Sequence, residues 1–224
     1  MTTVIFLRHG TSIANEKGVL AGRTPNVYLS PQGIKQAKQL TQPISELKVH
    51  KVLVSPLERC AQTIEPYLNA AKKRSYVNNS FVEMNYGDWS DKSLKDLRKL
   101  KDWKQVQEKP SKFTFPNGES FLKAQSRVIK ELNLLAKTYP NKTFLIVSHG
   151  DIIKLAVASS LNMKLDDFQR IVIDPASITA INWDKGLKTL LYVNRKVTKR
   201  SSSVKKKAVR NLRNRRVLGG GKGE

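Results

Sequence analysis

Two segments of the chain run from apolar residues directly into a histidine and a glycine. The first is Val4–Gly10, which ends in Arg-His-Gly, and the second is Phe144–Gly150, which ends in Ser-His-Gly. A neutral imidazole is a good nucleophile toward phosphorus when one ring nitrogen is held as a donor and the other is free. His9 and His149, two of the three histidines in the chain, are therefore the first candidates for chemistry.

A phosphoryl group in transfer carries negative charge on its oxygens and needs fixed cations and donors around it. Arg8 directly precedes His9, and Arg59 lies one helical turn past a predicted strand end, so both side chains can reach a group bound there. Each guanidinium group can bind two phosphate oxygens in bidentate fashion. His149 adds a further donor, and Glu83 is a candidate general acid if its pKa is raised toward neutrality. Plainer interpretations stay open: Arg-His-Gly as a chance triplet, Arg59 as a surface helix residue and Glu83 as a solvated charge.

Buried strands are expected to place these residues. A continuous apolar run is typical of a strand covered on both faces, and ligands bind at the carboxyl ends of such strands in open α/β sheets. Strands are predicted at 4–9, 51–55 and 144–149, and a hairpin of 177–183 and 189–193 turns at Asp184-Lys185-Gly186. Helices are predicted from Ser30-Pro31 to a kink or end at Pro43, and over 56–71, 119–139 and 151–161.

The segments between these elements are less regular. Residues 11–29 are predicted to form a long loop, residues 80–84 a short extended piece, and residues 85–117 short helices and loops that act as a cover. The alternation of strands and helices predicts an α/β layered domain. His50 has neither an apolar run before it nor a glycine after it, and we interpret it as a surface histidine.

Length and composition describe an ordinary globular domain. The 224 residues suffice for one sizeable core, and 39% hydrophobic with 26% charged residues is typical of a soluble protein. No apolar run approaches the roughly 20 residues that span a membrane, and the N-terminus does not resemble a secretion signal. Cys60 is the single cysteine, so we expect no internal disulfide, no structural zinc site and a cytoplasmic location.

The net charge of +23 is spread unevenly. From Arg195 onward there are 12 basic residues against the single acid Glu224, so this end carries +11 and residues 1–194 carry +12, which favours anionic substrates. We expect a domain over 1–198 and a basic C-terminal tail over 199–224 that cannot fold alone. Nonspecific contact of the tail with an anionic polymer such as nucleic acid is an alternative function, although the tail has no aromatic residue for stacking on bases.

Several motifs, in order along the chain, resemble the histidine phosphatase superfamily, the phosphoglycerate mutase-like proteins. They are Arg8-His9-Gly10 with Ser12 and Asn15, Ala21-Gly22-Arg23, Leu29-Ser30-Pro31-Gln32-Gly33, Gln36-Ala37, Ser55–Thr63, Glu83 with Tyr86-Gly87-Asp88-Trp89, Phe115–Ser120 and Val147-Ser148-His149-Gly150. The resemblance covers roughly residues 2–193 and is nearest to a phosphatase-type, actinobacterial-like branch.

The resemblance implies a three-layer α/β/α fold with a mostly parallel central sheet and helices on both faces. It also implies a metal-independent phosphomonoester hydrolase that uses no cofactor and acts through a phosphohistidine intermediate on a small phosphorylated metabolite. The implied nucleophile is His9, and Glu83 is the implied acid that protonates the leaving oxygen and then assists a water. The implied phosphate-binding residues are Arg8, Asn15, Gly22, Arg59, His149 and Gly150.

Some features depart from the family pattern or leave alternatives open. Thr11 stands where the family often has Glu, and Asp91 where Gly often follows the Trp-containing turn, which leaves the substrate pocket open. The short segment after Glu83 lacks the longer insertion of cofactor-dependent mutases and favours hydrolysis, with a mutase as the alternative. An inactive scaffold is disfavoured because all five candidate catalytic residues are present. The sequence does not indicate the natural substrate or the oligomeric state.

Overall fold

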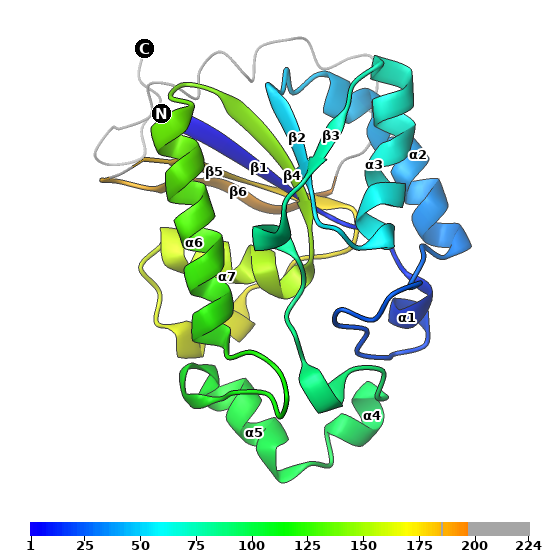
Figure 1. Ribbon diagram of the computed structural model, residues 1–224, viewed down its shortest axis with the longest axis vertical. Coiled ribbons are helices and arrows are strands. Elements are labelled where there is room, and N and C mark those ends of the chain that lie inside the picture. The colour runs from blue at the N-terminus through cyan, green and yellow to red at the C-terminus, as the bar shows by residue number, and fades with distance from the viewer. Residues whose placement is uncertain (185, 197–224) are drawn as a thin grey trace.

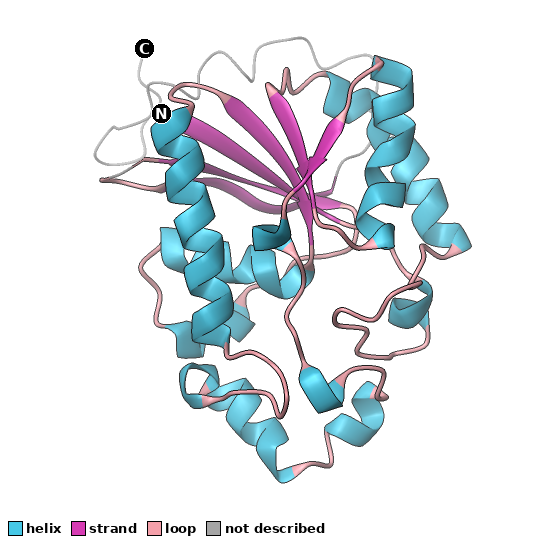
Figure 2. Cartoon of the chain, in the orientation of Figure 1, coloured by secondary structure: helices cyan, strands magenta, loops and turns pink. Residues whose placement is uncertain are grey.

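The computed structural model describes residues 1–184 and 186–196, which form a six-stranded sheet between two layers of helices (Figure 1; Figure 2). The strand order is β3-β2-β4-β1-β5-β6. The strands are β1 (Thr2–Arg8), β2 (Lys51–Val54), β3 (Ser75–Val77), β4 (Thr143–Ser148), β5 (Ser177–Trp183) and β6 (Thr189–Lys196). The first four are mutually parallel, whereas β5 and β6 add antiparallel pairs at one edge. The predicted mostly parallel sheet is confirmed.

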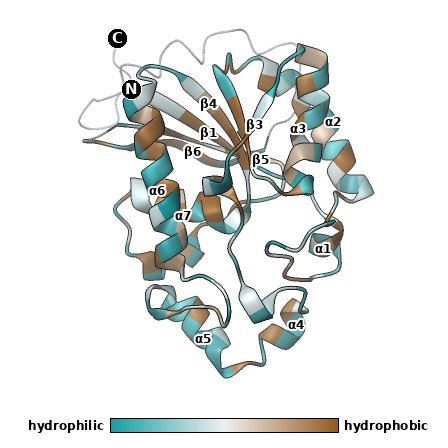
Figure 3. Cartoon of the chain, in the orientation of Figure 1, coloured by the Kyte–Doolittle hydropathy of each residue, from teal (hydrophilic) through white to brown (hydrophobic). Residues whose placement is uncertain are grey.

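Helices cover both faces of this sheet, as predicted. On one face lie α2 (Pro31–Ser45) and α3 (Glu58–Ala71), and on the other lie α6 (Phe121–Thr138) and α7 (Gly150–Ser160). Each face of the sheet packs into its own hydrophobic core, and alternate residues of the apolar strand β1 point into the two cores. Ile5 packs toward α2 and α3, whereas Phe6 packs toward α6 and α7. Figure 3 shows hydrophobic stretches along the central strands. This double coverage explains why β1 reads as one unbroken apolar run.

Side-chain capping accounts for the starts of α2 and α6. The Ser30 side chain accepts a hydrogen bond from the Gly33 amide and starts α2 at Pro31 as predicted, but the helix continues past Pro43 to Ser45. Ser120 caps α6 in the same way, so this helix begins at Phe121 and not at 119. The third helix begins two residues after Pro56, at Glu58.

Three small elements differ from the predictions. A short helix, α1 (Ile13–Glu16), lies within the predicted loop 11–29. The edge strand β3 is absent from the predicted elements, because it has three residues and its Tyr76 and Val77 are exposed. A single 3₁₀ turn at residues 79–81 overlaps the start of the segment predicted to be extended at 80–84.

The predicted cover segment is a small lobe of short helices. It contains α4 (Leu94–Leu97), α5 (Lys101–Glu108) and 3₁₀ turns at Gly87–Trp89 and Pro110–Lys112. A further 3₁₀ turn, Leu165–Arg170, precedes β5. Figure 1 shows α4 and α5 at the end of the molecule opposite the N-terminus. Ring contacts among Trp89, Trp103, Phe113, Phe115 and Phe121 attach the lobe to the start of α6.

Two further points concern the ends of the chain and its helices. The predicted boundary at 198, the basic tail 199–224 and Lys185 of the predicted turn lie outside the described residues. Among the helices that are described, none has the length and apolar character needed to cross a membrane.

Candidate active site

His9 lies immediately after β1 and is held from both sides. Its amide donates to the Ser148 carbonyl at 3.0 Å, and its own carbonyl accepts from the Ala176 amide at 3.2 Å. The ring Nδ1 lies 2.6 Å from the Gly10 carbonyl oxygen, which can only accept, so Nδ1 carries the proton and Nε2 keeps a free lone pair. Burial, together with the Arg59 and Arg8 charges, lowers the pKa of His9 well below its usual value. His9 is therefore a neutral imidazole at pH 7.

Arg8 brings a guanidinium group to the same strand end. Its Nη1 donates to the Ile173 carbonyl, while its buried Nε has no hydrogen-bond partner among the described residues. Gly150 borders this group, since a Cβ atom at Gly150 would lie 3.4 Å from the Arg8 Cζ. A Cβ atom at this distance would make an ordinary van der Waals contact, so Gly150 adjoins the guanidinium group but the contact does not require a glycine.

Arg59 is almost fully buried, with 2% of its surface exposed, in the first turn of α3. Its Nη2 donates to the Gly22 carbonyl at 2.8 Å and lies 3.3 Å from Nδ1 of His149, while Nη1 is buried with no partner in the described part of the chain. Gly22 has φ +53°, and a Cβ there would lie 2.9 Å from the Tyr86 ring, so the turn requires glycine. The surface-helix interpretation of Arg59 is wrong.

His149 follows β4 and is fully buried beside His9, with a ring-centroid separation of 5.2 Å. Because the Arg59 guanidinium can only donate, Nδ1 of His149 accepts, and Nε2 donates its proton to the Ser55 hydroxyl at 2.7 Å. Burial and the Arg59 charge lower the pKa of His149, which agrees with this neutral form. The single N–H of the neutral ring is bound to Ser55 in this structure, so donation from His149 to a phosphate stays a prediction.

Glu83 faces the same group of residues. Its Oε2 lies 3.9 Å from Nδ1 of His149, and its Oε1 accepts from the Met84 amide at 3.0 Å. Burial, helped by the Asp151 charge, raises the pKa of Glu83 to about 7. A carboxyl group with this pKa holds its proton in a large share of molecules at neutral pH, as a general acid must.

The comparison with known proteins agrees with this geometry. Residues 4–196 match the family described as histidine phosphatase superfamily (branch 1). The chain belongs to the histidine phosphatase superfamily. Its members act through a phosphohistidine intermediate, and the phosphatases among its relatives confirm the expected class, a phosphoric monoester hydrolase.

Three relatives illustrate the similarity. Phosphoserine phosphatase 1 of Hydrogenobacter thermophilus is 28% identical over 196 residues, which cover 87% of this chain and 92% of the relative. Adenosylcobalamin/alpha-ribazole phosphatase of Salmonella typhimurium is 27% identical over 198 residues, which cover 84% of this chain and 94% of the relative. The crystal structure of a phosphoserine phosphatase mutant from Entamoeba histolytica with phosphoserine superposes with a TM-score of 0.77 at 26% identity, covering 87% of this chain and 97% of that one.

Asn15 differs from the other predicted histidine phosphatase site residues in its hydrogen bonds and its exposure. Its Oδ1 accepts hydrogen bonds from the Ser12 amide at 3.0 Å and the Ser12 hydroxyl at 2.9 Å, which makes it part of the capping box of α1. Asn15 is exposed, and within the described residues these side-chain hydrogen bonds join it to Ser12 and not to His9 or the arginines. Phosphate contact by Asn15 stays a prediction.

Two residues of this site have no role assigned to them by the sequence patterns, although Thr63 ends the Ser55–Thr63 motif. Asp151, in the first turn of α7, accepts from the Tyr86 hydroxyl at 2.9 Å and acts on the pKa of Glu83. Thr63 accepts from the Gly10 amide at 2.9 Å through Oγ1 and donates to the Arg59 carbonyl at 2.6 Å. Their sequence signals are their spacings, directly after His149-Gly150 and one helical turn after Arg59.

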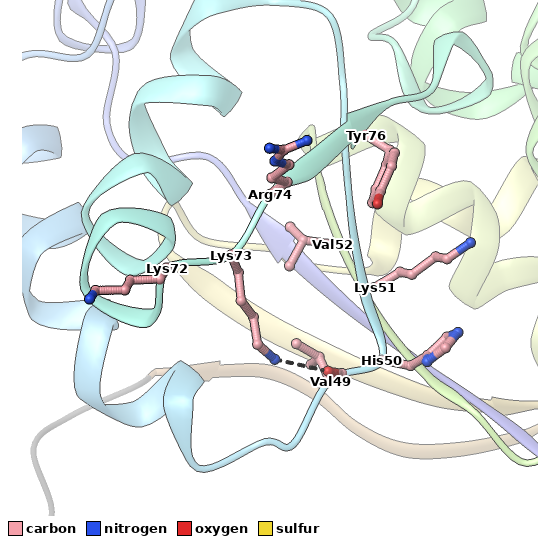
Figure 4. Close-up of a pocket in the computed structure, with 8 residues that line it drawn as sticks. All are labelled: Val49, His50, Lys51, Val52, Lys72, Lys73, Arg74 and Tyr76. Atoms are coloured by element: carbon pink, nitrogen blue, oxygen red, sulfur yellow. Dashed lines mark hydrogen bonds between the residues drawn. The ribbon is translucent and has the colours of Figure 1, made fainter.

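A cavity of about 390 Å³ lies at the opposite ends of the strands and is separate from this site (Figure 4). It lies at the amino ends of β2 and β3, whereas His9, Ser55 and His149 follow the carboxyl ends of their strands. Its lining residues are Val49, His50, Lys51, Val52, Lys72, Lys73, Arg74 and Tyr76. His50 is exposed, which confirms the surface interpretation of that histidine.

A second cavity of about 390 Å³ borders the chain segment that carries Glu83. It is lined by Arg23, Asn79, Val82, Asn85, Gly118, Glu119, Lys123 and Arg127. Within the described residues, no group of three or more His, Cys, Asp or Glu is placed to hold a metal ion.

Proposed function

We propose that this histidine phosphatase hydrolyses small aliphatic phosphomonoesters, with Nε2 of His9 as the attacking atom. One observation carries the assignment: the free Nε2 belongs to a neutral ring beside two arginines that each keep a buried N–H without a partner in the described structure. A buried donor without a partner is costly. Phosphate oxygens satisfy such donors, and the guanidinium fork matches them in geometry and charge.

In the first step, the lone pair on Nε2 of His9 forms a bond to phosphorus while the bond from phosphorus to the ester oxygen breaks. Glu83 gives its proton to that oxygen, so that an alcohol leaves in place of an alkoxide. The charge on the transferred group lies beside Arg8 and Arg59, whose side chains are already fixed before the reaction. Fixed charges need no reorganisation during the step.

In the second step, a water oxygen forms a bond to phosphorus and the bond to Nε2 breaks. Glu83, now a carboxylate, accepts the proton of this water and returns to its starting form. Inorganic phosphate is released and His9 is again neutral. The pKa of Glu83 near 7 suits both roles, since neither protonation state is strongly disfavoured at neutral pH.

The substrate class is proposed from the reaction and from two named relatives. A phosphoserine phosphatase and an adenosylcobalamin/alpha-ribazole phosphatase both align over more than four fifths of this chain. The +12 carried by residues 1–194 favours anionic substrates. We place the reaction in the cytoplasm, which is compatible with the single, buried and unpaired Cys60.

Phosphate release from a panel of phosphomonoesters tests the proposal. The panel contains phosphoserine, alpha-ribazole phosphate, phosphoglycerates and para-nitrophenyl phosphate. We expect release from several of these, loss of release in His9→Ala, and unchanged release in the exposed-histidine control His50→Ala. Transfer of phosphate between phosphoglycerate positions without release favours the mutase alternative, and no turnover of any substrate contradicts the proposal.

A further inference from the structure

Glu83, the proposed general acid, lies in a segment with little regular secondary structure. After the 3₁₀ turn at Asn79–Phe81, no helix or strand begins until Gly87, so external contacts must fix residues 82–86. Two arginines supply them at the backbone of Glu83. The Nε of Arg23 donates to the Glu83 carbonyl at 2.8 Å, and Nη2 of Arg127 approaches the same oxygen at 3.3 Å. Arg127 also donates from Nη1 to the Ser80 carbonyl at 2.6 Å.

Glu119 joins these two arginines into one unit. This residue is 6% exposed, and its Oε1 accepts from Nη2 of Arg23 at 2.8 Å and from Nη2 of Arg127 at 3.0 Å. The same oxygen accepts from the Asn85 amide at 2.9 Å, two residues past Glu83. A buried carboxylate held by two guanidinium groups has few alternative positions, because moving it leaves charges without partners.

The backbone connects this unit to the proposed phosphate-binding arginine Arg59. Arg23 directly follows Gly22, whose carbonyl holds Nη2 of Arg59 at 2.8 Å. The dipeptide Gly22-Arg23 therefore contacts both the arginine that faces the phosphoryl group and the backbone of the general acid. Its position sets one of these groups relative to the other.

We propose that Arg23, Glu119 and Arg127 are positioning residues that fix the Glu83 carboxyl group relative to the leaving oxygen. The inference rests on the proposed role of Glu83. Their contacts with residues 80–85 are to backbone atoms on either side of the Glu83 side chain, so they determine where the carboxyl group lies. A general acid works only within about 2.6–3.2 Å of its target, and misplacement by about 1 Å can cost a factor of about 10².

Leaving-group dependence separates this role from a general effect on the fold. An alkyl phosphate needs a proton from Glu83, whereas the leaving group of para-nitrophenyl phosphate hardly needs one. Arg23→Met and Glu119→Gln are expected to lower kcat for phosphoserine about 10-fold or more, and to change kcat for the aryl ester by less than about threefold. Arg23 has a side chain that is 37% exposed, so Arg23→Met is the variant expected to fold normally.

Lys123→Met is the matched control. Lys123 lines the same cavity and loses the same charge, but its side chain makes no hydrogen bond to Glu83 or Glu119 in the described part of the chain. We expect wild-type kcat for both substrates in this variant. A second readout uses the cavity of about 390 Å³ beside Glu119. In Glu119→Ala, added acetate is expected to enter this space and restore alkyl turnover in part, while chloride at equal ionic strength does not.

The outcomes decide between the inference and the function on which it rests. If the unmodified protein hydrolyses neither substrate and forms no phosphorylated His9, the proposed function fails and the inference falls with it. If it hydrolyses both, but Arg23→Met slows both equally or behaves like Lys123→Met, the positioning role alone is overturned. If Glu119→Gln does not fold, Arg23→Met decides. Absence of acetate rescue in a folded Glu119→Ala protein removes Glu119 from the unit.

Discussion

Nδ1 of His9 lies 2.6 Å from the carbonyl oxygen of Gly10, and this contact determines which ring nitrogen is free to react. A carbonyl oxygen accepts only, so the proton of the neutral ring is on Nδ1 and the lone pair is on Nε2. The residue after the histidine thus selects the tautomer through its backbone.

A phosphohistidine linked through Nε2 is therefore expected on His9. Rapid quenching with labelled substrate should trap a phosphoprotein that is labile in acid and stable in base. His9→Ala should carry no label, while His50→Ala should label normally because His50 is exposed and outside the site. Label that persists in His9→Ala, or that maps to Nδ1, would contradict the assignment.

Arg59→Ala is expected to slow substrates with good and poor leaving groups to similar degrees. In the proposed mechanism Arg59 stabilises charge on the phosphoryl group itself, and loss of one such fixed donor costs about 10²–10³ in kcat. Arg59→Lys should restore little, because an ammonium group cannot bind the Gly22 carbonyl, His149 and two phosphate oxygens at once.

The exposed Arg74 provides the control for charge alone, and Arg74→Ala should keep wild-type kcat. The measurement is kcat for phosphoserine and para-nitrophenyl phosphate in each variant. A loss confined to phosphoserine would assign Arg59 to leaving-group chemistry and contradict its phosphate-binding role.

Much of this site is predictable from short patterns in the sequence. The two His-Gly pairs stand at the ends of apolar runs, and strands buried on both faces are apolar throughout, so these patterns by themselves place His9 and His149 at one sheet edge. The role of Glu83 is indicated by the family resemblance and not by any local pattern. Its raised pKa depends on burial and on Asp151, 68 positions away, which the sequence alone does not bring together.

The support of Glu83 is not predictable from the sequence for the same reason. Glu119 and Arg23 are 96 residues apart and meet only because the loop after α1 and the start of α6 converge on one segment. Single charges in loops are usually solvated, so neither residue stands out as a buried partner. The strand β3 and the helix α1 are not predicted, because segments of three or four residues are too short to show a helical or strand periodicity.

Turnover is expected to survive exhaustive chelation. The Arg8 and Arg59 charges act on His9, and in the proposed mechanism these side chains stabilise the phosphoryl group. The measurement is phosphate release after dialysis against EDTA, with and without added divalent ions. Activity that disappears on chelation and returns with a divalent ion would contradict the proposed mechanism.

The pH dependence of turnover should follow Glu83. With an alkyl phosphate, kcat is expected to fall as pH rises through about 7, because the acid form of Glu83 is lost. Glu83→Gln should lower kcat for this substrate by a factor of about 10²–10⁴ and remove the alkaline decline. With para-nitrophenyl phosphate both effects should be much smaller. An unchanged alkaline decline in Glu83→Gln would assign it to another group.

The same carboxyl group should limit stability at high pH. Burial raises the pKa of Glu83 from 4.5 to about 7 in the folded protein, so the folded state binds this proton more tightly than the unfolded state. The stabilising effect of the bound proton is complete below the unfolded pKa and is lost as pH rises through the folded value. One pKa unit corresponds to about 1.4 kcal/mol, so the buried carboxylate costs up to about 3 kcal/mol at pH 8.

Glu83→Gln removes that cost because glutamine imitates the neutral acid. We expect its free energy of unfolding in urea to exceed that of the wild type at pH 8 by about 1–3 kcal/mol, and the difference to shrink toward pH 5. Glu108→Gln on the exposed face of α5 should show no such trend. A stability difference that does not change with pH would mean that Glu83 has the same pKa in both states. The expected result, a more stable and less active enzyme, is typical of a residue held in an unfavourable environment for catalysis.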